Sequence, residues 1–217
     1  MRLYTETVTP YLLDSLSRLM AHTAFRDFRL VGGTALSLLL GHRMSIDIDL
    51  FTDNEYGTVN MEEIGNALSE IFPYIDNKDK LKERNIGYSL YCGENAAEAI
   101  KIDLYYCDKF RNPVHCYSNI RIADIKDIAA MKILAISNSY RKKDYWDIHE
   151  LMNVIKLDEM IAFAEKMYPY VIEREEILNR LQNISVDKID DIPIRTFKEK
   201  YWEFVIEDIE ESARELR

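Results

Sequence analysis

The sequence predicts an α+β fold, with an α/β first half built on a mixed β-sheet flanked by helices and an all-helical second half. Two patterns support this prediction. Strict alternation of apolar and polar residues, which is typical of half-buried strands, is found before residue 124. After that point the apolar residues recur three and four positions apart, as on amphipathic helices. We therefore expect a core over residues 1–120 and a helical region over residues 121–217 that packs on it.

Each element of the first half has a local signal. Thr9 and Pro10 provide a cap and a first-turn proline for the first helix, and Gly32 and Gly33 separate a short apolar strand from an apolar helix. Gly93 lies in a turn between two alternating strands, which we expect to pair. The expected strands cover residues 28–31, 46–51, 87–92 and 99–107, and the expected helices cover residues 10–24, 33–40 and 60–71.

The second half is predicted to contain helices alone. Asp124 is placed to cap the first of them, and Asp127, at its third position, completes a start of the capping-box kind. The apolar stripe of this helix includes Ile128 and Ile136. The expected helices cover residues 125–137, 143–154, 158–167, 173–181 and 196–216.

Composition limits the classes of function. The chain has 38 acidic and 28 basic residues, a formal net charge of -10, which argues against a protein that coats nucleic acid through bulk charge. The cysteines, Cys92, Cys107 and Cys116, are odd in number and lack metal-finger spacing, so we expect a reducing compartment. No apolar run is long enough to cross a bilayer, and the N-terminus does not resemble a signal peptide. We expect a cytoplasmic protein without membrane contact.

Two glycines after the first strand predict a phosphate-binding turn. Without a Cβ atom, Gly32 and Gly33 allow the backbone to turn tightly into a helix whose free N–H groups face a phosphate. Thr34, Arg43 and Ser45 are candidates to donate further hydrogen bonds to the same phosphates. A serine that leads into a strand is often only a turn residue, so that alternative stays open for Ser45.

Three aspartates on strands predict a site for a divalent cation. Asp47 and Asp49 lie two positions apart and share one face of their strand, and Asp103 lies on the polar face of another strand. Such a cluster repels itself unless cations neutralise it, and a ligand set of oxygens favours Mg²⁺ or Mn²⁺. With the glycine turn beside it, the expected ligand is a metal-bound nucleoside triphosphate. In a two-metal mechanism Asp47 and Asp49 would hold metal across the phosphates, and Asp103 would bind the second ion and help to deprotonate the attacking hydroxyl.

Lys132 is unusual because it falls on the apolar stripe of its helix. Its ammonium group must either reach solvent or meet buried anions, for which phosphate oxygens or the aspartates are suitable. Asp144 begins the next helix, where a carboxylate also stabilises the helix dipole, so a purely structural role competes with a role in the site. The cluster Arg141, Lys142 and Lys143 is the best local candidate for contact with an RNA backbone, although such runs are usually solvated helix ends.

These motifs together resemble those of the AbiEii-type nucleotidyltransferase toxins of the DNA polymerase β-like superfamily. The resemblance covers roughly residues 30–151, and its motifs are Gly-Gly-Thr-Ala-Leu from Gly32, His-Arg-x-Ser-x-Asp-x-Asp-Leu-Phe from His42, Lys101-x-Asp103, Asp127-x4-Lys132 and Lys-Asp-Tyr-x-Asp from Lys143. It implies a nucleotidyltransferase fold, Mg²⁺, and transfer of a nucleotidyl group from a nucleoside triphosphate, to tRNA in some members. It also implies a cognate antitoxin for many members, and it favours Asp144 as a site residue.

Two other functions are compatible with the same residues. A small-molecule nucleotidyltransferase of the antibiotic-modifying kind would use the same glycines and aspartates with a different acceptor. A non-catalytic nucleotide-binding or interaction module could also retain the fold. A P-loop kinase and an α/β-hydrolase are poorly supported, because the chain has neither a Gly-x4-Gly-Lys-Ser/Thr motif after a strand nor a Gly-x-Ser-x-Gly motif.

Overall fold

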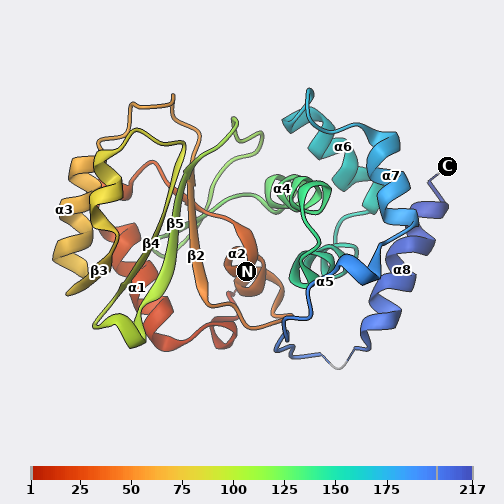
Figure 1. Ribbon diagram of the computed structural model, residues 1–217, viewed down its shortest axis with the longest axis horizontal. Helices are drawn as coiled ribbons and strands as arrows, with labels where there is room; N and C mark the ends of the chain where they lie inside the picture. Colours follow the sequence, from red (N-terminus) through yellow and green to blue (C-terminus); the bar gives the residue numbers. More distant parts are fainter. Residues whose placement is uncertain (1, 199, 217) are drawn as a thin grey trace.

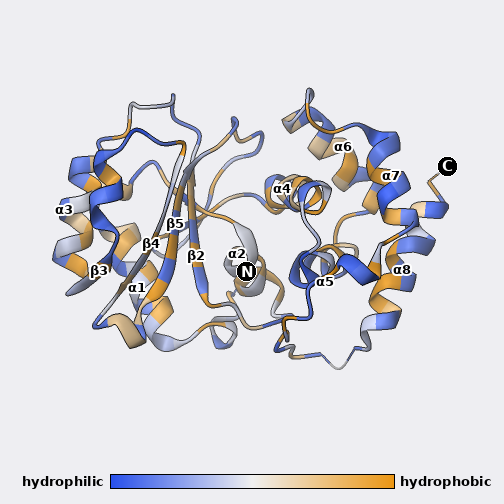
Figure 2. Cartoon of the chain, viewed as in Figure 1, coloured by the Kyte–Doolittle hydropathy of each residue, from blue (hydrophilic) through white to orange (hydrophobic). Residues whose placement is uncertain are grey.

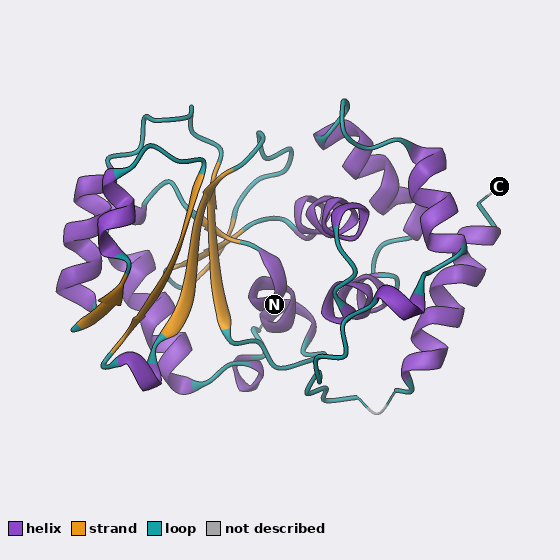
Figure 3. Cartoon of the chain, viewed as in Figure 1, coloured by secondary structure: helices purple, strands orange, loops and turns teal. Residues whose placement is uncertain are grey.

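The sheet and the helical region lie side by side along the long axis of the molecule (Figure 1). The computed structural model describes residues 2–198 and 200–216. Helices α1 (Pro10–Ala21) and α3 (Met61–Ile71) cover one face of the sheet, and α2 (Gly32–Leu40) lies on the other face, toward the helical region (Figure 3). The helices of the second half are α4 (Ile125–Asn138), α5 (Lys142–Leu151), α6 (Leu157–Met167), α7 (Arg174–Gln182) and α8 (Trp202–Arg214).

The sheet has seven strands in the order β3-β4-β5-β2-β1-β7-β6. They are β1 (Arg29–Leu30), β2 (Asp47–Thr52), β3 (Tyr74–Asp76), β4 (Gly87–Gly93), β5 (Ile100–Tyr106), β6 (His115–Tyr117) and β7 (Ile120–Ile122). The pairs β2/β5 and β1/β7 are parallel, and the other neighbours are antiparallel. The predicted mixed sheet, its flanking helices and the all-helical second half are therefore confirmed.

Local sequence explains the elements that surround the central strands. The Thr9 side chain accepts a hydrogen bond from Leu12 N at 3.1 Å and Pro10 begins α1, as predicted. On β2, Ile48 and Leu50 are fully buried against the core, so the alternating aspartates face the opposite side. The hydropathy colouring shows the same division, because hydrophobic residues follow the inner faces of helices and strands (Figure 2).

Three strands were not expected. β3, β6 and β7 have three residues each, too few for alternation to be recognised in the sequence, and they are held by their neighbours in the sheet. β7 reaches Ile122, so the sheet extends two residues beyond the expected boundary at residue 120. The expected first helix ends at Ala21 instead of residue 24 and is followed by a 3₁₀ turn, Thr23–Phe25.

The last helix also begins later than expected. Residues 196–201 were predicted to be helical, but α8 begins at Trp202; residue 199 lies outside the described residues. The chain before it is extended because its backbone bonds to the loop that precedes β2: Met44 N donates to Arg195 O at 2.8 Å and Phe197 N donates to His42 O at 3.0 Å. This return of the chain links the two halves (Figure 1).

The structure also bears on the membrane prediction. Among the helices of the described residues, none has both the length and the apolar content needed to cross a bilayer.

Candidate active site

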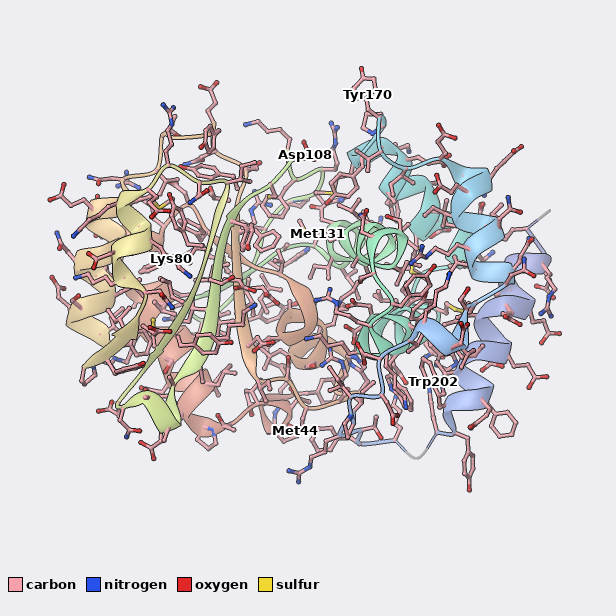
Figure 4. The ribbon with its side chains drawn as sticks, in the orientation of Figure 1. Met44, Lys80, Asp108, Met131, Tyr170 and Trp202 are labelled. Atoms are coloured by element: carbon pink, nitrogen blue, oxygen red, sulfur yellow. The ribbon has the colours of Figure 1, made fainter. Side chains whose placement is uncertain are left out.

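A cavity of about 570 Å³ lies between the exposed face of the central strands and helices α4 and α5. The glycine turn after β1 and the side chains of β2 and β5 form one wall, and residues of α4 and α5 form the other. Met131 of α4, labelled in Figure 4, lies between the helix and the sheet. The predicted site residues on this cavity are Gly32, Gly33, Arg43, Ser45, Asp47, Asp49, Asp103, Lys132 and Asp144.

The parallel pairing of β2 and β5 brings the three aspartates together. Asp49 lies directly opposite Asp103, and Asp47 lies opposite Lys101. Because side chains two positions apart on a strand share a face, all four of these side chains point into the same cavity. The predicted convergence of Asp47, Asp49 and Asp103 is therefore confirmed, although β2 and β5 are separated by more than forty residues of chain.

The cluster is an anionic site whose negative charge is only partly offset by nearby lysines. The pKa of Asp49 rises from 3.8 to about 6, because burial disfavours its charge and the carboxylates of Asp103 and Asp47 repel it, while Lys132 and Lys143 partly offset the rise. A carboxylate held in such surroundings favours any cation that can approach it.

Two lysines neutralise part of this charge. Lys101 Nζ donates to Asp103 Oδ2 at 2.6 Å, and Lys143 Nζ lies 3.6 Å from Asp47 Oδ2. The other oxygen of Asp103, Oδ1, is buried and has no hydrogen-bond partner among the described residues. Neither lysine was predicted as a neighbour of the aspartates, although Lys101 lies two positions before Asp103 on the same face of β5.

The donor set fits a divalent metal ion. Three carboxylates, one of them with an unpartnered buried oxygen, face one another across a cavity, and oxygen ligands suit Mg²⁺ or Mn²⁺. In the described part of the chain, however, no group of three or more His, Cys, Asp or Glu side chains is already arranged to hold a metal ion.

The glycine turn has two neighbours that exclude larger side chains. Gly32 has a φ of +68°, and a Cβ atom there would collide with the Asp49 carboxylate. A Cβ atom on Gly33 would meet the Arg43 guanidinium. The pair begins α2, whose first N–H groups have no partner within the helix, so the turn is free to contact an anion at the cavity.

Thr34 and Ser45 are placed to support the turn. The Thr34 hydroxyl is fully buried and hydrogen-bonds to Ser45 Oγ at 2.8 Å and to the backbone oxygen of Asp47. Their hydroxyls therefore tie α2 to the beginning of β2 and are engaged with each other. Ser45 lies at the cavity, and Thr34 lies behind it.

Arg43 contacts an aspartate that was not predicted as a site residue. Its Nε and Nη2 donate to the two oxygens of Asp147 at 2.6 and 2.8 Å, and Nη1 donates to Met44 O at 3.1 Å. His42 Nε2 lies 2.8 Å from the same carboxylate. Both side chains are buried, so the donors that we expected to meet a triphosphate are engaged by Asp147. The sequence did contain a sign that Asp147 belongs to the site, because Asp147 lies three positions after Asp144 and therefore on the same side of the helix.

Lys132 also points at these aspartates. Its Nζ lies 2.6 Å from both Asp144 Oδ1 and Asp147 Oδ2, and its side chain is 7% exposed, so it does not reach solvent. Burial alone would lower the pKa of Lys132, but the two carboxylates raise it. Burial alone would raise the pKa of Asp147, but the positive charges of Arg43 and Lys132 hold it well below 3.8. Of the two sequence alternatives for Lys132, buried anionic partners are confirmed.

Asp144 has the ion-pair partners expected of a site residue, whereas Asp127 does not have the capping role predicted for it. Asp144 accepts from Arg141 Nε at 2.7 Å as well as from Lys132, so it is an ion-pair partner at the cavity. Asp124 caps α4 through Lys126 N at 2.9 Å, as predicted. The capping box was wrong, because Asp127 accepts instead from the backbone of residues 111 and 112, whose loop it holds in place.

Comparisons with known proteins give one similar sequence and several proteins of similar fold. The chain is 29% identical over 210 residues to the uncharacterized protein aq_aa25 of Aquifex aeolicus (strain VF5), covering 93% of this chain and 94% of that protein. The nucleotidyltransferase toxin MenT4 of Mycobacterium tuberculosis H37Rv has the same fold, with a TM-score of 0.58 at 12% identity over 95% of this chain and 82% of that one. JHP933 of Helicobacter pylori has a TM-score of 0.54 at 19% identity over 94% and 88% of the two chains.

The family follows from a match over almost the whole chain. Residues 14–215 match the family described as nucleotidyl transferase AbiEii toxin of type IV toxin–antitoxin systems. This span includes the glycine turn, the three strand aspartates and the ion-pair cluster around Asp147. The chain therefore belongs to the AbiEii nucleotidyltransferase toxin family.

Proposed function

We propose that this protein is a Mg²⁺-dependent toxin that transfers a nucleoside monophosphate from a nucleoside triphosphate to an acceptor hydroxyl on RNA, such as tRNA. The observation that carries the proposal is the register of β2 and β5. It places Asp47, Asp49 and Asp103 on one face of a cavity, beside a glycine turn that begins α2 and lines the same cavity. An anionic cluster and an anion-binding turn side by side suit a metal-bound triphosphate, which carries both charges.

The residues divide the chemistry between them. Asp47, Asp49 and Asp103 would hold Mg²⁺, with Mn²⁺ as a substitute, and the backbone N–H groups at Gly32 and Gly33 would bind the phosphates that leave. Bound Mg²⁺ would supply positive charge for the phosphate oxygens and lower the pKa of a bound hydroxyl. Once a cation takes their place at the carboxylates, Lys101 and Lys143 are free to contact phosphate oxygens.

The reaction is an in-line displacement at the α-phosphorus. The acceptor oxygen forms a bond to that phosphorus, the bond to the bridging oxygen of the β-phosphate breaks, and pyrophosphate leaves with its electron pair. Asp103 would accept the proton of the attacking hydroxyl, a role supported by its Oδ1, which is buried and has no hydrogen-bond partner among the described residues.

An RNA acceptor is supported by the basic residues at the edge of the cavity. Arg141 and Lys143 lie on its lining, with side chains that are 50% and 42% exposed. Lys142 stacks its ammonium over Trp202 at 5.1 Å and is less available. Family membership supports a cognate antitoxin as a further partner. A reaction that uses nucleoside triphosphates and tRNA would take place in the cytoplasm.

A labelling experiment tests the proposal. The purified protein is incubated with Mg²⁺, each α-labelled triphosphate in turn, and total RNA, and the labelled species is identified. We expect wild type to label RNA and Asp49→Asn to label none, while Asp14→Asn, which changes an exposed aspartate on α1, labels as wild type does. RNA without label from any triphosphate would refute the RNA acceptor. Label on a small molecule from a cell extract would favour the antibiotic-modifying type, and no label on any acceptor would favour a non-catalytic module.

A further inference from the structure

The cavity extends beyond the aspartates into an apolar end that the proposed chemistry does not use. On β2 and β5 the residues two positions after Asp49 and Asp103 are Phe51 and Tyr105, and they lie directly opposite each other. Their ring centroids are 5.5 Å apart with an interplanar angle of 39°. Both line the same cavity as the aspartates, so one sheet face changes from ionic to aromatic along its length.

Helix α4 supplies the opposite wall of this end. Ile128, Met131 and Ala135 line the cavity at helical spacing, so one face of α4 lies across from the aromatic pair. Met131 is only partly buried, although it is apolar, and it lies between α4 and the sheet (Figure 4). Tyr168 is part of the same lining. Side chains of an ordinary core would be fully buried, whereas Phe51, Tyr105 and Met131 keep accessible surface at the cavity.

The order of these groups along the sheet matches the order of groups in a nucleotide. Val31 N donates to Asp49 O at 2.9 Å, so the glycine turn that follows lies beside the aspartates, on the side away from Phe51. The aromatic pair lies two residues further along the strands, a rise of about 7 Å. Phosphates at the turn and metal at the aspartates would thus leave room for one ribose before the base reaches the rings.

We propose that the apolar end of the cavity binds the nucleobase of the donor triphosphate, between the Phe51–Tyr105 pair and Met131. This inference rests on the proposed function. The aromatic pair gives the base a stacking surface, which every base can use, and Met131 covers its other face with a polarizable thioether. The chain contributes this affinity through residues that take no part in the chemical step.

Equilibrium binding separates the base from the phosphates. Calorimetry measures the dissociation constants of each nucleoside triphosphate and of inorganic tripolyphosphate, with Ca²⁺ in place of Mg²⁺ so that no turnover occurs. The variants are Phe51→Leu, which keeps apolar volume without a ring, and Met131→Ala. The matched control is Tyr56→Ala, which removes an exposed aromatic ring outside the cavity. Circular dichroism confirms that each variant is folded.

We expect Phe51→Leu to weaken binding of its preferred triphosphate about tenfold, the effect of losing one base–aromatic stack. Met131→Ala should weaken the same binding, and neither variant should change the affinity for tripolyphosphate. Equal affinity of wild type for triphosphates and tripolyphosphate would overturn the base site and leave the proposed function standing. Unchanged triphosphate affinity in Phe51→Leu with weaker RNA binding would also overturn it, because the rings would then hold the acceptor. A wild type that binds neither ligand would overturn the proposed function and this site together.

Discussion

Replacing Asp147 with alanine is expected to lower the free energy of unfolding by about 3–5 kcal/mol, the range for breaking a buried ion pair from one side. The fully buried carboxylate accepts from Arg43 Nε and Nη2, from Lys132 Nζ, and lies 2.8 Å from His42 Nε2. Without it, Lys132 keeps Asp144, but among the described residues the buried Arg43 guanidinium keeps only the Met44 carbonyl as a hydrogen-bond partner. The loss is therefore dominated by an unpaired buried charge.

Urea denaturation at pH 7 measures this loss. Asp208→Ala is the matched control, because Asp208 accepts from His149 at 2.8 Å but is 56% exposed, and a pair of that kind contributes less than about 1 kcal/mol. The Asp147→Ala deficit should persist at pH 4, since Arg43 and Lys132 hold the pKa of Asp147 well below 3.8 and the carboxylate stays charged there.

A double-mutant cycle identifies the source of the loss. Arg43→Met combined with Asp147→Ala removes the charge and its partner together, so the double variant should be more stable than Asp147→Ala alone. A deficit below about 1 kcal/mol for Asp147→Ala, or additive losses in the cycle, would refute the reasoning that Arg43 depends on this carboxylate.

Three further outcomes are expected from the site itself. In metal-free buffer, the contribution of Asp49 to the free energy of unfolding should fall by about 2 kcal/mol as the pH rises from 4 to 7, because its pKa of about 6 exceeds 3.8 and the folded state holds the extra proton between these values. Urea titrations of Asp49→Asn should lack this component, and an identical pH profile would contradict it. Gly32→Ala should abolish triphosphate binding measured by calorimetry and lower the melting temperature, since a Cβ atom at Gly32 meets Asp49 and the φ of Gly32 is +68°. The control Gly65→Ala in α3 should be tolerated. Mg²⁺ with a triphosphate should raise the melting temperature of wild type but not of Asp103→Asn, and an equal rise in both would remove Asp103 from the metal ligands.

Much of the fold could be predicted from the sequence because its signals are local. The alternation in β2 and β5 gave both the strands and the faces of their aspartates, and helix caps such as Thr9 marked element ends. The three-residue strands β3, β6 and β7 carry no comparable local signal, and the helix start near residue 196 was overridden by backbone bonds to the loop at Met44. Long-range pairing, which no short window of sequence records, decided each of these differences.

In the candidate site, too, local sequence patterns predicted the strand aspartates, but not the contacts between distant parts of the chain. Residue type and spacing were enough to single out Asp47, Asp49 and Asp103. The partner of Arg43 was not foreseen, because Asp147 lies 104 positions later in the chain and could be taken as a charge at a helix start. Lys101 shares the face of Asp103, so its contact could have been inferred from the same alternation that placed the aspartate.

The extended segment at residues 195–197 also has a consequence for synthesis of the chain. Its backbone pairs with residues 42–44, immediately before the strand that carries Asp47 and Asp49. A ribosome must therefore translate some 150 further codons before the loop leading into that strand acquires its final partner. A nascent or prematurely terminated chain without residues 195–197 therefore lacks this backbone support for the loop that leads into β2.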